Sequence, residues 1–290
     1  MIEHAGKQFD DHLMRPFNLT KRLVSNFKSD EFEIFVTYGM PEGIGKSSYN
    51  HYVLADIAGY YACHDRDKIQ WMWKKRDERP DETRLWELDW EGCKPYILYL
   101  PQDVVNLMIR LSDTEQRMVA LEWDDAGTWL NAMDYNDPFV VAFKKYLSLA
   151  RSSLAGIILS TPVEEWLLRS LRMSTGLIHT RVMTAPHTND HLFWKPRIAK
   201  SYRIEKYIGR MKPYYNTVFE DMFYAITPDS FYGWYKPLRH HYIKEATEMM
   251  RKALDKRKKQ KPAQVVKDSV ILEDIAKAND GAEELLEIMR

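Results

Sequence analysis

Residues 31–61 read EFEIFVTYGMPEGIGKSSYNHYVLADIAGYY, and the order of elements within this stretch decides the fold. Residues 34–36 form a short apolar, β-prone run, which is typical of a buried parallel strand. Glycines and a proline interrupt the pattern as far as Gly45, and after Ser47 apolar residues return near helical spacing. A strand, a glycine-rich loop, Lys-Ser and a helix, in that order, predict a phosphate-binding loop.

In such a loop the backbone N–H groups point at phosphate oxygens, and the positive end of the helix dipole lies beside them. We expect Lys46 to reach the β- and γ-phosphates and the Ser47 hydroxyl to ligate Mg²⁺. The residues expected to surround the nucleotide are Pro41, Glu42, Gly43, Ile44, Gly45, Lys46, Ser47 and Ser48.

The loop resembles the Walker A motif of P-loop NTPases, with one departure. Met40 occupies the position of the first glycine of that motif, and Gly39 lies one place earlier. The alternative is a glycine turn that only joins a strand to a helix and happens to precede Lys-Ser.

The composition limits the classes of protein to consider. Lys+Arg and Asp+Glu are both 42 of 290 residues, so a contact with nucleic acid would need a local basic patch. The two cysteines, Cys63 and Cys93, lack a metal-ligand spacing and indicate a reducing compartment. The chain begins without the apolar core of a signal peptide, and no run is long and apolar enough to span a membrane. We therefore expect a cytoplasmic protein with no membrane partner.

A second motif follows the apolar residues 118–121, where Glu122-Trp-Asp124-Asp125 closes a predicted strand. An apolar strand that ends in two carboxylates is the Walker B arrangement, so we expect Asp124 to bind the metal and Asp125 to orient or deprotonate the attacking water. Glu122 leaves the register of this assignment ambiguous, and Asp-Asp-Ala-Gly is also favourable turn chemistry.

Residues 154–159 predict another buried strand, which ends in Ser160-Thr161. A hydroxyl at this place corresponds to the sensor-1 position of additional-strand ATPases, so Thr161 or Ser160 is expected to contact the γ-phosphate or the water. A helix N-cap is the alternative role. The amphipathic pattern of residues 163–172 predicts a helix with two arginines on one side.

Together these motifs, over about residues 30–185, resemble the ATPase core of the AAA+/RecA division of P-loop NTPases. The segment DDAGT at 124–128 looks most like that of bacterial helicase loaders and IstB-type transposition ATPases. The resemblance implies an α/β fold with a mainly parallel β-sheet flanked by helices, and ATP and Mg²⁺ as cofactors. It also implies ATP hydrolysis coupled to a DNA transaction such as replication, helicase loading or packaging.

The same resemblance implies a homo-oligomer in which Arg169 or Arg172 reaches the nucleotide of a neighbouring subunit. Two solvated arginines on a surface helix are the alternative. A small-molecule kinase and a nucleotide-gated interaction protein with little turnover are alternative functions of a chain with these motifs.

The C-terminal part departs from the AAA+ pattern. Residues 180–184 predict a fifth strand, and residues 192–207 alternate basic and aromatic side chains, as in strands or a hairpin that could contact nucleic acid. The basic run 251–261 offers DNA contacts through Lys256, Arg257, Lys258 and Lys259, or is a solvated helix end. The expected organisation is lead-in helices at 1–30, an ATPase core with a β-rich insertion at 31–250, the basic linker at 251–261 and a helical tail at 262–290.

Overall fold

The computed structural model describes residues 16–64, 87–172, 177–185, 196–205 and 214–245, with residues 247, 248, 251 and 255. The chain divides into two compact units, Met1–Tyr232 and Gly233–Arg290. The four basic residues at 256–259 that are predicted to contact DNA lie outside the described residues. Within the described part of the chain, no helix has the length and apolar character to cross a bilayer.

A seven-stranded mixed sheet forms the centre of the first unit, in the order β2-β3-β4-β1-β5-β6-β7. The first five strands in this order are parallel, whereas β6 and β7 run antiparallel as an added hairpin. The predicted α/β fold with a mainly parallel sheet is confirmed, and it is consistent with a P-loop NTPase core. The strands are β1 (Glu33–Tyr38), β2 (Ile97–Leu98), β3 (Leu121–Trp123), β4 (Gly156–Thr161), β5 (Leu177–Thr184), β6 (Pro196–Glu205) and β7 (Tyr214–Tyr224).

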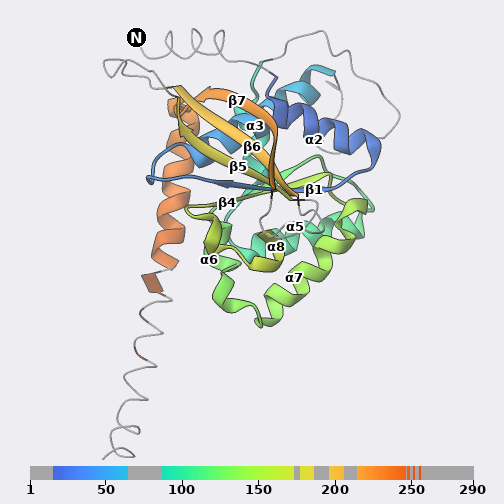
Figure 1. The fold of residues 1–290 in the computed structure, drawn as a ribbon, viewed down its shortest axis with the longest axis vertical. Coiled ribbons are helices and arrows are strands. Elements are labelled where there is room, and N and C mark those ends of the chain that lie inside the picture. Colours follow the sequence, from blue (N-terminus) through green and yellow to red (C-terminus); the bar gives the residue numbers. More distant parts are fainter. Residues whose placement is uncertain are drawn as a thin grey trace, which may run out of the picture. The chain divides into compact units, whose positions relative to one another are not determined.

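Helices cover both faces of the sheet, because parallel strands need crossover connections that pack on one face or the other. In Figure 1, α2 and α3 lie on one face, and α5, α7 and α8 lie on the other. The helices are α2 (Asn18–Ser29), α3 (Lys46–His64), α4 (Trp90–Cys93), α5 (Pro101–Asp113), α6 (Ala126–Trp129), α7 (Pro138–Leu149) and α8 (Arg169–Arg172). Short 3₁₀ turns are η1 (Lys94–Tyr96), η2 (Ala132–Asp134), η3 (Ala150–Ser152) and η4 (Glu164–Trp166).

Local sequence explains why these elements begin where they do. Asp137 accepts hydrogen bonds from the backbone of Phe139 and Val140, and Pro138 occupies the first turn of α7. Every residue of β4 is buried, as expected of a central parallel strand with a near-continuous apolar sequence.

The predicted helix over 163–172 is wrong in its extent: residues 164–166 form η4, and only Arg169–Arg172 form the short helix α8. The reason is tertiary, because Leu167 forms a β-bridge with Asn131 and the backbone of Leu168 donates to Leu130. These pairings hold the intervening backbone extended, which interrupts the helix. The short strand β2 directly follows the 3₁₀ turn η1.

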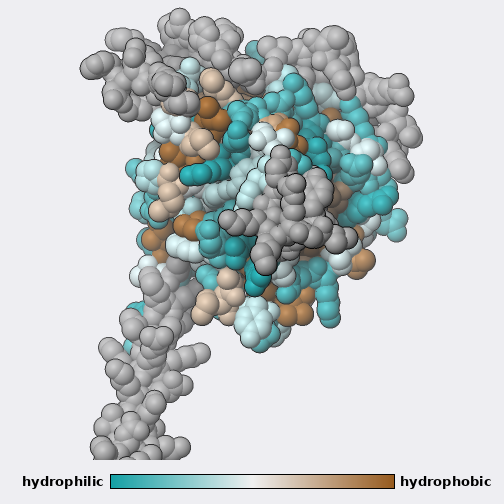
Figure 2. Space-filling model, in the orientation of Figure 1, coloured by the Kyte–Doolittle hydropathy of each residue, from teal (hydrophilic) through white to brown (hydrophobic). Residues whose placement is uncertain are grey.

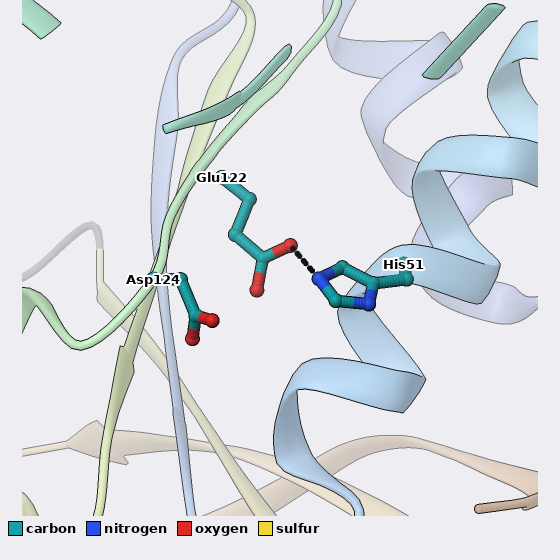
Figure 3. Close-up of side chains that lie close together, drawn as sticks. All are labelled: His51, Glu122 and Asp124. Carbon is teal, nitrogen blue, oxygen red and sulfur yellow. Dashed lines mark ion pairs between the residues drawn. The ribbon is translucent and has the colours of Figure 1, made fainter. Parts of the chain in front are cut away.

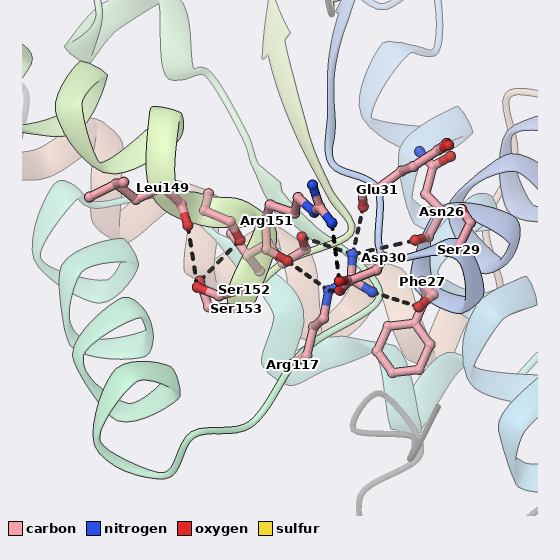
Figure 4. A network of polar contacts seen from close by, with 12 residues as sticks. Asn26, Phe27, Ser29, Asp30, Glu31, Arg117, Leu149, Arg151, Ser152 and Ser153 are labelled. Atoms are coloured by element: carbon pink, nitrogen blue, oxygen red, sulfur yellow. Dashed lines mark hydrogen bonds and ion pairs between the residues drawn. The ribbon is translucent and has the colours of Figure 1, made fainter. Parts of the chain in front are cut away.

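Arg117 joins three segments at the end of the sheet where β1 and β4 begin (Figure 4). Its guanidinium donates to the carbonyls of Phe27 at 2.5 Å and Glu31 at 2.6 Å, which follow one another around the end of α2. The same group lies 3.7 Å from the Asp30 carboxylate. The bond to Phe27 satisfies one of the carbonyls that the end of α2 leaves without an intrahelical donor.

The surface of the described residues is mixed in polarity. On the face in Figure 2, hydrophobic side chains form separate patches among hydrophilic ones. Met133 and Leu149 are the two most exposed large hydrophobic side chains of the described residues, with 85% and 74% of their surface accessible.

Candidate functional site

The loop of residues 39–45 joins the carboxyl end of β1 to the first residue of α3. Gly43 and Gly45 have φ angles of 80° and 106°, which residues with a side chain rarely adopt. A Cβ on Gly45 would lie 2.8 Å from the Cβ of Ala225, the residue after β7. The hairpin therefore packs directly against the loop, and Gly45 is needed for both its conformation and its lack of a side chain.

The departure of the loop at Met40 has a structural explanation. A Cβ on Gly39 would lie 2.5 Å from the carbonyl oxygen of Val182 in β5, so the close approach that requires glycine occurs at 39. Met40 itself does not have a positive φ, and 62% of its surface is accessible. A methionine at position 40 is therefore compatible with the loop.

Lys46 and Ser47 occupy the first turn of α3 beside this loop. The Lys46 Nζ donates to the carbonyl of Gly39 at 3.3 Å, so the side chain folds back along the loop. The Ser47 hydroxyl donates to Asp124 Oδ1 at 3.0 Å, across from the end of β3. The two residues predicted to hold the metal are thus brought together from positions 77 residues apart.

Asp124 is 1% exposed, and its Oδ1 accepts two further hydrogen bonds. The Ser160 hydroxyl donates to it at 2.5 Å and the backbone N–H of Asp125 donates to it at 3.1 Å. The Asp125 N–H also lies 2.8 Å from Ser160 Oγ, and Asp125 has a φ of 52°, so the chain turns sharply there into α6. Asp125 itself is partly exposed at this corner.

The two hydroxyls at the end of β4 point in different directions. Ser160 contacts Asp124, whereas the Thr161 hydroxyl donates to the carbonyl of Val163. Thr161 also lies against α6, where a Cβ on Gly127 would be 2.3 Å from its Oγ1. The structure therefore places Ser160, rather than Thr161, beside the predicted metal ligand.

The two arginines predicted to reach a nucleotide, Arg169 and Arg172, form no bond to the loop of residues 39–45 in the described part of the chain. Arg172 donates through Nε to the carbonyl of Leu167 at 2.9 Å, and Arg169 is exposed on α8. Among the described residues, neither forms a hydrogen bond or ion pair with residues 39–47 or with Asp124.

A buried polar chain lies beneath this site and connects β1, α3 and β3. Thr37 donates to Asn50 at 2.9 Å, and Asn50 donates to Glu122 Oε1 at 2.8 Å. The other oxygen of Glu122 lies 3.4 Å from His51 Nε2. Figure 3 shows Glu122 on β3 and Asp124 directly after it on the side of the sheet that faces His51 on α3, as residues two apart in extended backbone point to one face.

Burial controls the ionisation of Glu122 and His51. Burial raises the pKa of Glu122 well above its usual range, the charge of Asp124 raises it further, and the hydrogen bond from Asn50 lowers it. Burial also lowers the pKa of His51 to about 4, against the opposing effect of Asp124. Burial thus disfavours the charged form of both side chains when nothing else compensates their charge.

Sequence reasoning considered Glu122 only as an alternative to Asp125 and did not single out Asn50 or His51. The available signal was their spacing, because positions 50 and 51 follow Ser47 by three and four residues and share its side of the helix. Only the fold reveals that Glu122 faces them.

Arg197, near the start of β6, also contacts the loop. Its Nε donates to the carbonyl of Ile44 at 3.0 Å, and burial lowers its pKa. The sequence pattern assigned this segment to a hairpin that could contact nucleic acid and gave no indication of a contact with the loop.

The donor set at Ser47 and Asp124 fits Mg²⁺. A hydroxyl and a carboxylate oxygen 3.0 Å apart are hard oxygen donors, and both lie next to a loop with two positive-φ glycines and a helix N-terminus. Proteins hold Mg²⁺ through one or two such groups together with phosphate oxygens and water.

Comparisons with known proteins give a likeness in structure and no match in sequence. No protein family and no curated protein matches the sequence. The N-terminal domain of zonular occludens toxin from Neisseria meningitidis is similar in structure, with 12% sequence identity and a TM-score of 0.34. The likeness covers 70% of this chain and 98% of that domain.

Proposed function

We propose that this chain binds ATP with Mg²⁺ at the loop between β1 and α3 and hydrolyses the γ-phosphate. The observation that carries the proposal is the 3.0 Å hydrogen bond from Ser47 to Asp124. It pairs the hydroxyl of the Lys-Ser sequence with the first carboxylate after a neighbouring strand, at the carboxyl edge of a parallel sheet where α/β proteins bind ligands.

Different groups of the chain would bind the phosphates and the metal ion. Backbone N–H groups of the loop and the first turn of α3 would hold the phosphates. Lys46 would exchange its bond to Gly39 for the β- and γ-phosphate oxygens, and Ser47 and Asp124 would hold the metal. The bound Mg²⁺ would neutralise charge on the phosphate oxygens.

Asp125 is proposed to orient the attacking water. Its backbone N–H is fixed by Ser160, and the residue is partly exposed, as a residue that orients water requires. Glu122 fits the role less well, because it is fully buried and Asn50 holds one of its oxygens. The Ser160 hydroxyl, which contacts both carboxylate-bearing residues, is proposed in place of Thr161 as the polar group of the neighbouring strand.

The biological role is proposed to be a DNA transaction. Two features of the sequence support it: the resemblance of the DDAGT segment to helicase loaders, and the basic run at 251–261. The same resemblance supports a homo-oligomer in which Arg169 or Arg172 completes a neighbour's site. Partial recovery of activity on mixing the inactive Lys46→Ala and Arg172→Ala proteins would support this arrangement, and no recovery there or with Arg169→Ala would contradict it.

The experiment that tests the function measures ATP turnover by the full chain alone, with single-stranded DNA and with double-stranded DNA. Turnover that requires Lys46 and rises with DNA is the expected result. Turnover that requires Lys46 but ignores DNA would retain the ATPase and reject the DNA role. Tight ATP binding without turnover would instead indicate a nucleotide-gated interaction protein.

A further inference from the structure

The buried cluster of His51, Glu122 and Asp124 lies beneath the proposed nucleotide site and has a donor set that ATP hydrolysis does not need (Figure 3). One nitrogen or oxygen atom from each of the three side chains lies within 4.8 Å of the others, and all three residues are buried. Glu122 Oε2 accepts no hydrogen bond among the described residues, although it is fully enclosed. A buried carboxylate oxygen without a donor costs free energy unless something else satisfies it.

The distance between His51 Nε2 and Glu122 Oε2 distinguishes a direct hydrogen bond between the two side chains from joint binding of one metal ion. At 3.4 Å it exceeds the usual range for an N–H···O hydrogen bond, ~2.7–3.2 Å. Two donor atoms that share one tetrahedral ion, each about 2.1 Å from it, lie roughly 3.4 Å apart. The pair is therefore spaced as two ligands of one ion would be.

The third donor is Asp124, which the alternation of side chains along extended backbone places on the same face as Glu122. Glu122 and Asp124 alternate with the buried Trp123, so both carboxylates face α3, and His51 meets them from that helix. One carboxylate oxygen of Asp124 lies within 4.8 Å of the ligand atoms of both His51 and Glu122. Two carboxylates also balance the charge of a divalent cation, which a buried site requires.

We propose that His51, Glu122 and Asp124 form a binding site for a divalent transition metal ion such as Zn²⁺, separate from the Mg²⁺ of the nucleotide. One imidazole nitrogen with two carboxylate oxygens is a donor set that Zn²⁺ takes in proteins, whereas Mg²⁺ prefers oxygen donors alone. The ion would bind without nucleotide and would cross-link α3 to β3 below Ser47. The donor atoms thus indicate a transition metal ion, and the place of the site between α3 and β3 indicates a structural role.

The test uses the full chain, stripped of metal with a chelator and free of nucleotide, and titrates it with Zn²⁺ by calorimetry. The proposal predicts one Zn²⁺ per chain. Glu122→Gln and His51→Gln should each weaken binding by at least about a hundredfold, because loss of even an outer partner of a ligand costs ~10–100-fold. His241→Gln, which removes an exposed histidine elsewhere, should bind as wild type does.

Two further variants and readouts keep the result decisive. Lys46→Ala should lose ATP and keep Zn²⁺, so failure of the nucleotide site and failure of the metal site are distinguishable. Zn²⁺ should raise the Tm of wild type and Lys46→Ala but not that of Glu122→Gln. If a cluster variant does not fold, the visible absorption spectrum of Co²⁺ bound to wild type decides, since a tetrahedral N/O site gives an intense band. Absence of stoichiometric Zn²⁺ binding, equal binding by both cluster variants, or a Co²⁺ spectrum without that band would each overturn the proposal.

Discussion

Asp124 is oriented by its neighbours before any ligand arrives. Three donors converge on its Oδ1, from the side chains of Ser47 and Ser160 and from the backbone of Asp125. Because each donor comes from a different element, the direction of the carboxylate depends on the packing of α3, β3 and β4 together. A site that is held in this way loses little free energy when it orders around a ligand.

Kinetic measurements distinguish the proposed role of Asp125 from that of Glu122. Asp125→Asn should keep ATP affinity within about twofold and lower single-turnover hydrolysis by ~10²–10⁴-fold, because only the transition state uses a water-orienting carboxylate. Measuring the ATP dissociation constant and the single-turnover rate separates binding from chemistry. Glu122→Gln is the matched comparison, and abolished hydrolysis there with normal hydrolysis in Asp125→Asn would show that the assignment is displaced by three residues.

At the scale of elements, the loop of residues 39–45 depends on strands that come more than a hundred residues later. Val182 of β5 packs closely against Gly39, and Ala225 after β7 packs closely against Gly45. These contacts support the backbone of the loop. The antiparallel hairpin therefore contributes to the shape of the loop as well as extending the sheet.

Two glycines of the loop provide a matched test of this support. Gly45→Ala introduces a Cβ 2.8 Å from Ala225 at a φ of 106°, and should lower the free energy of unfolding by about 2–4 kcal/mol and reduce ATP affinity. Gly43→Ala meets no atom within 4 Å, so it should cost only the conformational strain of ~1–2 kcal/mol. Urea unfolding gives both values, and equal losses would contradict the contact between loop and hairpin.

Glu33 joins α2, β1 and β6, and its ionisation affects stability. It lies 2.5 Å from Arg22 and 2.6 Å from Arg203, and Asn26 donates to it. Burial by itself raises the pKa of Glu33, but the hydrogen bonds of Arg22 and Asn26 and the charges of both arginines outweigh it and hold the pKa below 4.5. The folded state therefore binds the proton less readily than the unfolded state.

The sign of this shift fixes a pH dependence. The contribution of Glu33 is fully present above its ordinary pKa and is lost as the pH falls through the lower folded value. Glu33→Gln should lower the free energy of unfolding by about 1–3 kcal/mol at pH 7, and the difference from wild type should shrink below pH 4.5. Urea unfolding between pH 7 and pH 3.5 checks it, and a difference that stays constant over this range would contradict the role of the ionised carboxylate.

The sequence predicted the central elements because their signals are local. Apolar β-prone runs mark β1 and β4. The helix over 163–172 was predicted wrongly because its amphipathic pattern was overridden by backbone pairing of residues 167 and 168 with a distant loop.

The candidate site was predictable only in part. Ser47 and Asp124 belong to patterns that can be recognised in one short stretch, and the structure brings these two residues together. Arg197 and His51 belong to no such pattern, because their importance depends on which strand or helix they face in the folded chain. The opposite directions of Ser160 and Thr161 likewise follow from how β4 sits in the sheet.

At the scale of the whole molecule, the balanced charge confines any electrostatic attraction for DNA to local patches. The basic run at 251–261 is the densest of these in the sequence. Each phosphate that a protein neutralises releases counterions, so binding through such a run depends steeply on salt.

Replacing Lys256, Arg257, Lys258 and Lys259 by Gln should therefore weaken DNA binding at low salt and flatten its salt dependence. For four phosphate contacts the slope of log K against log salt should fall in magnitude by about 3–4 for duplex DNA. Fluorescence anisotropy at several salt concentrations measures it. An unchanged slope would place the DNA contacts elsewhere, and no binding by wild type at low salt would reject a DNA partner.

The most direct test of the proposed nucleotide site is calorimetric titration of ATP with Mg²⁺ into wild type, Lys46→Ala and Lys21→Ala. Lys21 is an exposed lysine on α2, so its replacement controls for the loss of one positive charge. Wild type and Lys21→Ala should bind one ATP per chain with equal affinity. Lys46→Ala should bind at least about a hundredfold more weakly, since a charge-assisted contact to phosphate contributes ~1.5–3 kcal/mol or more. Equal affinity in wild type and Lys46→Ala, or no ATP binding by wild type, would contradict the assignment of this loop as the nucleotide site.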